Sequence, residues 1–355
     1  MIAITFQVME PVIRRLYASI PSGLPLRHED RTMQRRQFLT AATGLATLAA
    51  AGLARADGSL PRAEDDASAA RAWNAARRYR PTRFGDIAYV ERGTGPVALF
   101  LHGFPLNGFQ WRGAFDRLAS HRRCIAPDSL GLGFTRVAAG QRVTPSDQAD
   151  MLAAFLDALG IASVDLVAND SGGAVAQIFV TRFPDRVRTL LLTNCDVEPD
   201  SPPPALQPVL ALAREGTYPD QWLVPWFKDP TLARSPRGFG GMCFSDPSQP
   251  TDAAIAMYFG PLVASPASKA LVNAYTLGLD PNPLAGIEAA LRQCKVPVRI
   301  VWGMADDIFA SESPDYLDRL LPSSRGVRRL PRAKLFWPEE YPDVVAEEAR
   351  KLWGV

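Results

Sequence analysis

The residues with the clearest chemical potential lie where a mostly apolar run, ending at Ala168, turns into a helical pattern. A strand that turns directly into a helix needs small residues two positions before and two positions after its apex. Ala168 and Gly172 meet this need if Asp170 is the apex, whereas an apex at Ser171 would put Asn169 in a small position. The spacing therefore favours an exposed carboxylate on a strained turn, where it could attack carbon as a nucleophile. The alternative is that Asp170 simply caps the helix.

The elements that would position this turn alternate between apolar strands and helical patterns from residue 79 onward. Thr144 opens one helix, with Asp147 three residues later in the manner of a capping box. Continuous apolar strands separated by helices predict an α/β fold with a mostly parallel sheet covered on both faces. The expected strands cover 87–90, 97–101, 123–126, 164–168, 189–193 and 296–303, and the expected helices 109–118, 144–159, 284–294, 314–321 and 342–353.

The alternation lapses between residues 197 and 283, which are rich in proline and aromatic residues. We interpret this stretch as an inserted helical cap. The predicted core then consists of residues 79–196 and 284–355.

The N-terminal region has the pattern of a targeting segment. Arg35-Arg36 is followed by a mild apolar run and by Ala54-Arg55-Ala56, which is typical of a twin-arginine signal peptide spanning 33–56. Residues 1–32 are interpreted as a mis-assigned start or a disordered extension, and 57–78 as a polar lead-in. The sequence thus predicts export to the periplasm, with no stable membrane anchor after cleavage.

Composition excludes several classes of function. The 355 residues carry a net charge of only +2, without a strongly basic face, so no nucleic-acid partner is expected. The four cysteines are far apart and fit no metal spacing, and no phosphate loop or dinucleotide motif is present. We expect no metal or organic cofactor. The aromatic cap favours a small apolar molecule as the partner.

Several motifs together resemble the α/β-hydrolase superfamily, in the family's order and spacing. The branch with an Asp nucleophile and a helical cap, which contains epoxide hydrolases and haloalkane dehalogenases, is the most similar. The motifs are His102-Gly103-Phe104-Pro105, Trp111-Arg112, Pro127-Asp128, the turn at Asp170 and Trp302-Gly303-Met304-Ala305-Asp306.

The resemblance assigns roles to individual residues. Asp170 matches the nucleophile, and the backbone N–H groups of Phe104 and Ser171 match the oxyanion hole. Asp306 matches the acid that orients a catalytic histidine, with Asp307 and Asp196 as alternatives.

For the remaining candidate residues, a structural role is as good an explanation as a functional one. His102 is expected to support the oxyanion loop rather than to exchange protons. Trp111 and Tyr258 are candidate substrate contacts. Tyr218, Tyr258 and Tyr275 are candidates for the cap tyrosines that activate an epoxide oxygen in relatives, and core packing would explain each of them equally well.

The chain departs from the family where the catalytic histidine should stand, because Leu335 occupies that position and no histidine follows His121. Attack by a carboxylate needs no base, but hydrolysis of the resulting ester does. Lys334, Glu339 and Glu340 are the nearby candidates for a replacement base, each more simply read as a solvated charge.

The halide site of the family is also incomplete. Ser171 stands where haloalkane dehalogenases have a tryptophan, and Phe104 where they commonly have an asparagine.

The sequence therefore predicts a hydrolase that acts on an epoxide or alkyl halide through an alkyl-enzyme ester at Asp170. One alternative is a non-hydrolytic or ligand-binding protein that lost turnover with the histidine. The other is a serine esterase that uses Ser171.

Overall fold

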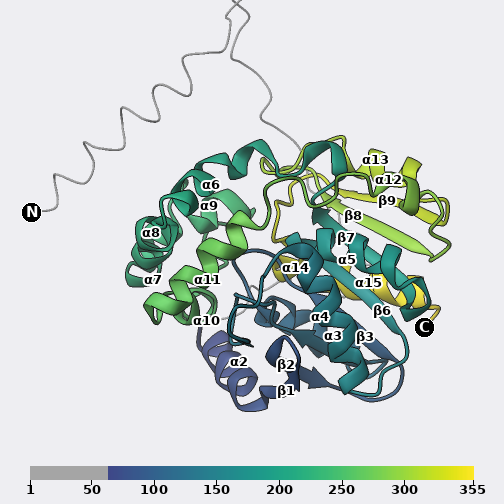
Figure 1. Cartoon of the computed structure of the whole chain (residues 1–355), viewed down its shortest axis with the longest axis horizontal. Coiled ribbons are helices and arrows are strands. Elements are labelled where there is room, and N and C mark those ends of the chain that lie inside the picture. Colours follow the sequence, from purple (N-terminus) through teal and green to yellow (C-terminus); the bar gives the residue numbers. More distant parts are fainter. Residues whose placement is uncertain (1–62) are drawn as a thin grey trace, which may run out of the picture. The chain divides into compact units, whose positions relative to one another are not determined.

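The structure is a computed structural model that describes residues 63–355 (Figure 1). The predicted signal peptide at 33–56 and the segment 1–32 lie outside the described residues, so the export prediction stays a prediction.

The described chain is built on one sheet with the spatial order β1-β2-β4-β3-β6-β7-β8-β9, and β5 pairs with β2. The pairs from β4 to β9 are parallel, whereas β2 pairs antiparallel with β1, β4 and β5. The strands are β1 (Arg78–Thr82), β2 (Gly85–Arg92), β3 (Val97–Leu101), β4 (Arg123–Pro127), β5 (Arg136–Val137), β6 (Val164–Asp170), β7 (Val187–Cys195), β8 (Val298–Gly303) and β9 (Ser324–Leu330).

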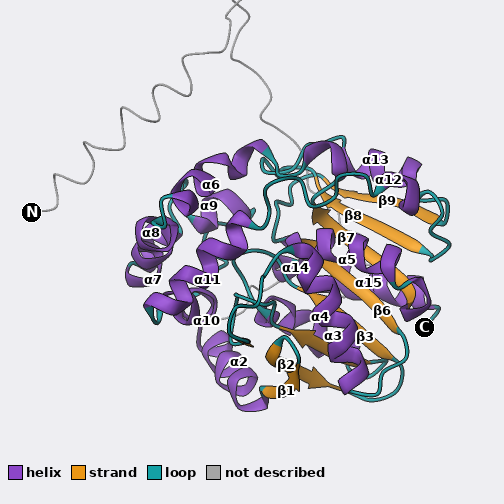
Figure 2. Ribbon diagram, viewed as in Figure 1, coloured by secondary structure: helices purple, strands orange, loops and turns teal. Residues whose placement is uncertain are grey.

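Helices cover both faces of this sheet (Figure 2). Every residue of β3 and β6 is buried, as continuous apolar strands between two helical layers must be. α4 packs beside α5, and α15 packs beside α3. The helices outside the cap are α2 (Ala63–Ala76), α3 (Arg112–Leu118), α4 (Pro145–Ala158), α5 (Ser171–Arg182), α12 (Glu288–Leu291), α13 (Ser313–Leu320), α14 (Trp337–Glu340) and α15 (Pro342–Trp353).

The insertion predicted between 197 and 283 is helical and contributes no strand to the sheet. No single helix within residues 63–355 is long and apolar enough to cross a membrane; α10 and α11 meet the criterion only as a pair, bent by 97°. The helices here are α6 (Gln207–Arg214), α7 (Val224–Lys228), α8 (Pro230–Ala233), α9 (Phe239–Cys243), α10 (Asp252–Val263) and α11 (Pro266–Leu277).

Several elements differ from the sequence prediction, including the unexpected strands β1 and β5. The polar lead-in contains α2, which buries Trp73 against Phe109 and Phe115. The charged edge strand β9 has no apolar run to reveal it. The helix expected over 284–294 shortens to α12.

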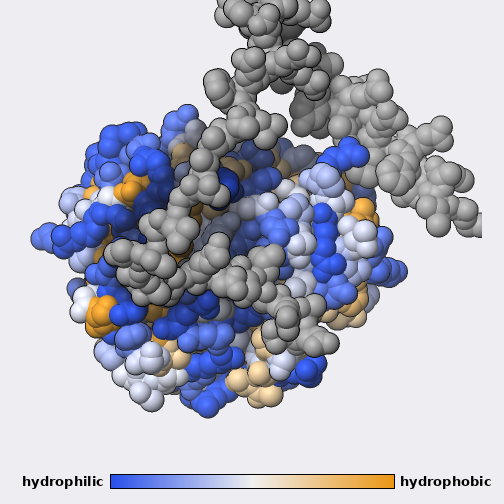
Figure 3. Space-filling view, turned by 180° about the vertical axis from the view of Figure 1, so that it is seen from behind, coloured by the Kyte–Doolittle hydropathy of each residue, from blue (hydrophilic) through white to orange (hydrophobic). Residues whose placement is uncertain are grey.

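The surface turned away from Figure 1 shows mainly hydrophilic side chains, with hydrophobic ones scattered among them (Figure 3). Few large apolar side chains are exposed in the described part of the chain, and scattered ones need no functional explanation. They are Tyr79, Phe227, Leu232, Tyr341 and Val355.

Candidate active site

Asp170 stands at the apex of the turn between β6 and α5. Its φ of 54° and ψ of −132° make it the one non-glycine residue between 63 and 355 with positive φ. A side chain at Gly172 would come within 2.6 Å of the His102 carbonyl oxygen, so this turn requires a small residue there. The backbone strain therefore falls on Asp170 and not on Ser171, as the spacing predicted.

Two backbone N–H groups converge on one oxygen of this carboxylate. The N–H of Phe104 donates to Asp170 Oδ1 over 2.7 Å, and the N–H of Ser171 donates to the same atom over 2.6 Å. Ser171 is the first residue of α5, so the positive end of the helix dipole faces the carboxylate. Oδ1 is thus fixed, and Oδ2 is the oxygen that these donors leave available for attack.

Burial sets the protonation of Asp170. The side chain is buried, which raises the pKa of Asp170 to about 6, while the bonds from Phe104 and Ser171 partly offset the increase. A carboxyl with this pKa is mostly ionised at neutral pH and is poorly solvated. Both properties favour a nucleophile.

Two further carboxylates lie at the carboxyl ends of the neighbouring strands. Asp196 directly follows β7, and burial together with the charge of Asp170 raises its pKa to about 7. Asp306 follows β8, and burial raises its pKa to about 6 despite bonds from the N–H of Ile308 (3.0 Å) and the amide of Asn194 (2.8 Å). These shifts mark an acidic, poorly hydrated centre around Asp170.

Buried amides connect the turn to the loop that carries Leu335. Asn169 Nδ2 donates to the Leu335 carbonyl over 3.2 Å and to the Asn194 carbonyl over 3.1 Å. Asn194 Oδ1 in turn accepts from Trp337 Nε1 over 3.1 Å. Asn194 was not among the candidates from the sequence, and Asn169 entered only as a poor fit for a small position. An amide near the end of a largely buried strand was the available signal for both.

The loop before α14 places an apolar side chain where the family has its base. Leu335 is 2% exposed, and its chain neighbours lie against the end of β8, where the N–H of Ala305 donates to the Ala333 carbonyl over 3.0 Å. Asp306 directly follows Ala305, and the adjoining loop carries Leu335 rather than a histidine.

The three candidate replacement bases have other partners. Lys334 Nζ donates to the Gly241 carbonyl over 2.8 Å and lies 3.7 Å from Asp307. Glu339 is ion-paired with Arg112 at 2.8 Å. The remaining candidate, Glu340, accepts bonds from the backbone N–H groups of Ser245 and Asp246. Their contacts give no support to a role as base.

His102 has the contacts of a structural residue. The N–H of Ser129 donates to its Nε2 over 3.0 Å, so Nδ1 carries the proton and donates to the Gly103 carbonyl over 2.9 Å. Burial lowers the pKa of His102 and keeps it neutral. Its role as support for the oxyanion loop, proposed from the sequence, agrees with this geometry.

Two of the candidate tyrosines contact Ser171 or Phe104, the residues whose N–H groups bond to Asp170. The Tyr275 hydroxyl donates to Ser171 Oγ over 3.0 Å, and its ring stacks on Phe104 with centroids 5.5 Å apart. Tyr218 also contacts the Phe104 ring, at 5.8 Å. Burial raises the pKa of both tyrosines, so their hydroxyls remain proton donors at neutral pH.

The two side chains predicted to contact substrate have different surroundings. Trp111 is fully buried against Phe100, and the Tyr258 hydroxyl donates to Glu339 over 2.7 Å. Packing and an ion-pair network explain both, so their contacts give no support to the predicted role.

The parallel sheet, the strained turn and the paired N–H donors define the class of the α/β hydrolases. The chain matches the α/β hydrolase fold family over residues 96–332 and belongs to that family.

Among its relatives, the 2-hydroxy-6-oxo-2,4-heptadienoate hydrolase of Pseudomonas putida is 46% identical over 103 residues, 28% of this chain and 37% of that protein. A haloalkane dehalogenase of Mesorhizobium japonicum is 43% identical over 108 residues, 28% of this chain and 33% of that protein. The matches thus span about a third of the length of these relatives. An epoxide hydrolase structure shares the fold with a TM-score of 0.65 and 21% identity, covering 78% of this chain and 98% of that one.

Proposed function

We propose that the protein opens a small apolar epoxide by attack of Asp170 and forms an alkyl-enzyme ester. The observation that carries the proposal is the pair of N–H bonds to Asp170 Oδ1 at 2.7 and 2.6 Å. In the reaction, Oδ2 forms a bond to one epoxide carbon as the C–O bond of that carbon breaks. The released alkoxide needs a proton, and we assign this donation to the Tyr275 hydroxyl, which contacts Ser171 Oγ over 3.0 Å.

The preference for an epoxide over an alkyl halide follows from the groups around Asp170. Hydroxyls of Tyr275 and Ser171 suit an oxygen leaving group that stays attached to the substrate. An indole N–H and a side-chain amide, which would suit a halide, are replaced by Ser171 and Phe104. The non-hydrolytic alternative is favoured by Leu335, since the ester has no imidazole to activate water.

Intact mass spectrometry tests this function. The protein is incubated at pH 8 with a panel of aliphatic and aryl epoxides and of matched alkyl halides, then digested to locate any modification. We expect a gain equal to the whole mass of the epoxide, on the peptide that contains Asp170, persisting for hours. A mass gain on another peptide would contradict the proposal, as would the absence of both an adduct and a diol with every member of the panel. Rapid release of diol without an adduct would instead show that hydrolysis of the ester is fast.

The rate of adduct formation should depend on pH through Asp170. Only the carboxylate attacks, and burial raises the pKa of Asp170 to about 6, so the rate should rise about tenfold per pH unit below 6 and level off above 7. Initial rates from intact mass between pH 4.5 and 8.5 give the profile. Circular dichroism over the same range provides the control for folding. A rate independent of pH between 5 and 7 contradicts the assignment.

A further inference from the structure

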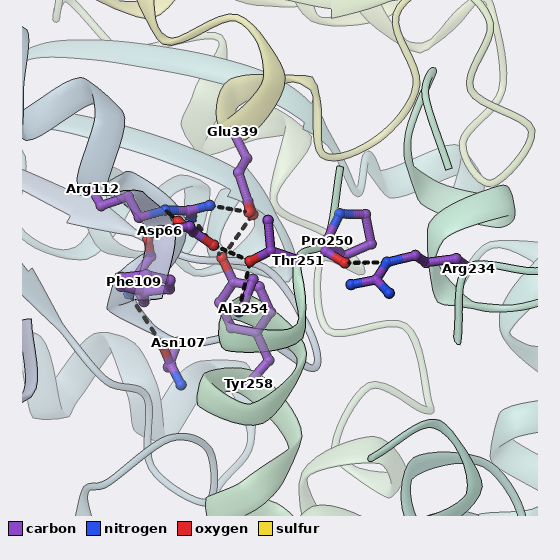
Figure 4. A network of polar contacts seen from close by, with 10 residues as sticks. All are labelled: Asp66, Asn107, Phe109, Arg112, Arg234, Pro250, Thr251, Ala254, Tyr258 and Glu339. Atoms are coloured by element: carbon purple, nitrogen blue, oxygen red, sulfur yellow. Dashed lines mark hydrogen bonds and ion pairs between the residues drawn. The ribbon is translucent and has the colours of Figure 1, made fainter. Parts of the chain in front are cut away.

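A buried network centred on Arg112 joins four separate segments of the chain (Figure 4). Arg112 Nε donates to Asp66 Oδ1 over 2.7 Å, and Nη2 donates to Glu339 Oε1 over 2.8 Å. Tyr258 accepts from Arg112 Nη1 over 3.3 Å and donates to Glu339 Oε2 over 2.7 Å. The Thr251 hydroxyl donates to the second oxygen of Asp66. We call these five residues the Arg112 network.

The five members of the network come from four parts of the fold. Asp66 belongs to α2, Arg112 begins α3, and Glu339 belongs to α14. Thr251 caps α10 of the insertion, and Tyr258 lies within that helix. The carboxylates are nearly inaccessible, with side chains 1% exposed for Asp66 and 2% for Glu339. Charge-assisted bonds in such surroundings hold their partners in one geometry.

Beyond the network, α2 and the residue after it also contact the core and α10. Trp73 is buried between Phe109 and Phe115 of the core, with ring centroids 5.8 and 5.1 Å away. Arg77, just after α2, donates to Met257 Sδ of α10 over 3.7 Å. The helix thus bridges the core and α10.

The network connects to both sides of Asp170. On one side, α14 follows Phe336, a buried ring so close to Gly103 that a side chain there would meet both Phe336 and Asp170 within 3 Å. On the other side, α10 packs against α11, which carries Tyr275. A shift of α10 or α14 would therefore change what surrounds the nucleophile.

We infer that Asp66 is a positioning residue: through Arg112, Glu339 and Thr251 it holds α10 and α14 in the arrangement that encloses Asp170. A helix that precedes the α/β core is thereby part of the site. The inference rests on the proposed function only for its rate measurement.

The experiment compares Asp66→Asn with Asp116→Asn in the full chain. Asp116 pairs with Arg92 on the surface, with its side chain 61% exposed, and serves as the matched control. Amide hydrogen exchange is followed in α10 and α11, and the rate of adduct formation at Asp170 is measured against epoxide concentration. Thr251 also caps α10 by accepting from the Ala254 N–H over 3.2 Å, so the second variant is Thr251→Gly, which removes the bond to Asp66 and leaves glycine, itself a favourable N-cap residue, at the start of α10. It answers the question if Asp66→Asn fails to fold.

Asp66→Asn and Thr251→Gly should each speed exchange in α10 and α11 about tenfold, the effect expected from one lost charge-assisted bond. Adduct formation at low epoxide should fall by a similar factor, while the control variant matches the wild type. A lower melting temperature with unchanged exchange in α10 and α11 would reduce Asp66 to a general stabilising role and overturn the inference. If the wild type forms no adduct, the proposed function fails, and the exchange measurement still tests whether Asp66 holds α10 in place.

Discussion

Replacing Asp170 with asparagine is expected to abolish alkylation, lowering the rate of adduct formation by at least about a thousandfold. The amide oxygen of the new side chain can still accept the N–H bonds of Phe104 and Ser171, which are 2.7 and 2.6 Å long in the wild type. The fold should therefore persist while the nucleophile is lost. Intact mass after incubation with the reactive epoxide is the measurement.

Ser171→Ala is the matched control for this substitution. It keeps the backbone N–H that contacts Asp170 Oδ1 and removes only the hydroxyl that accepts from Tyr275. Adduct formation at Asp170 should survive in this variant at a reduced rate, because the nucleophile is intact while the Tyr275 hydroxyl loses its partner. Ester hydrolysis that Ser171→Ala abolishes and Asp170→Asn spares would instead make Ser171 the nucleophile, as in a serine esterase.

The turn could be predicted from sequence because sterics alone select its apex. Only small residues fit two positions from a strained apex, and Ala168 and Gly172 mark Asp170. The capping box of α4 is confirmed for a similar reason, since Thr144 and Asp147 interact within a single helical turn. Such features depend on neighbours in the chain.

The arrangement around Asp170 depends on contacts between distant segments, and the sequence does not encode these in any local pattern. Asp66 and Thr251 are 185 positions apart, and nothing near either residue indicates that they bond. Glu339 was a candidate base because it follows Leu335 closely, yet its ion pair with Arg112 turns it toward the network. Among the three cap tyrosines, only tertiary packing separates Tyr275 from Tyr258.

The structure shows the surroundings of Asp306 in a chain without the expected histidine. Asp306, which the sequence resemblance matches to the acid of the family's triad, is held by the Ile308 N–H and the Asn194 amide. Burial raises its pKa to about 6. Under the proposed function, Asp170 and its two N–H donors would form the ester, and no imidazole at position 335 would activate water to cleave it.

Leu335→His is accordingly expected to convert a single alkylation into repeated turnover. The segment before Leu335 contacts the end of β8 through the bond from Ala305 to Ala333, so an imidazole at this position would come near Asp306. Asp306 could accept its Nδ1–H and leave Nε2 to deprotonate water. A positioned general base contributes about 10² to 10⁴ in rate, which sets the expected acceleration of ester hydrolysis. Diol release and the lifetime of the adduct are the measurements.

The controls for this variant distinguish the effect of the imidazole as a base from the effect of any polar side chain at this position. Leu335→Asn introduces a polar group of similar size without a base and should leave the adduct persistent. Adding Asp306→Asn to Leu335→His should remove most of the gain, because the imidazole would lose the carboxylate that orients it. The rate should also rise with pH through about 6.5 as the imidazole loses its proton. An adduct equally long-lived in Leu335→His and the wild type would mean that more than the histidine is missing from the second step.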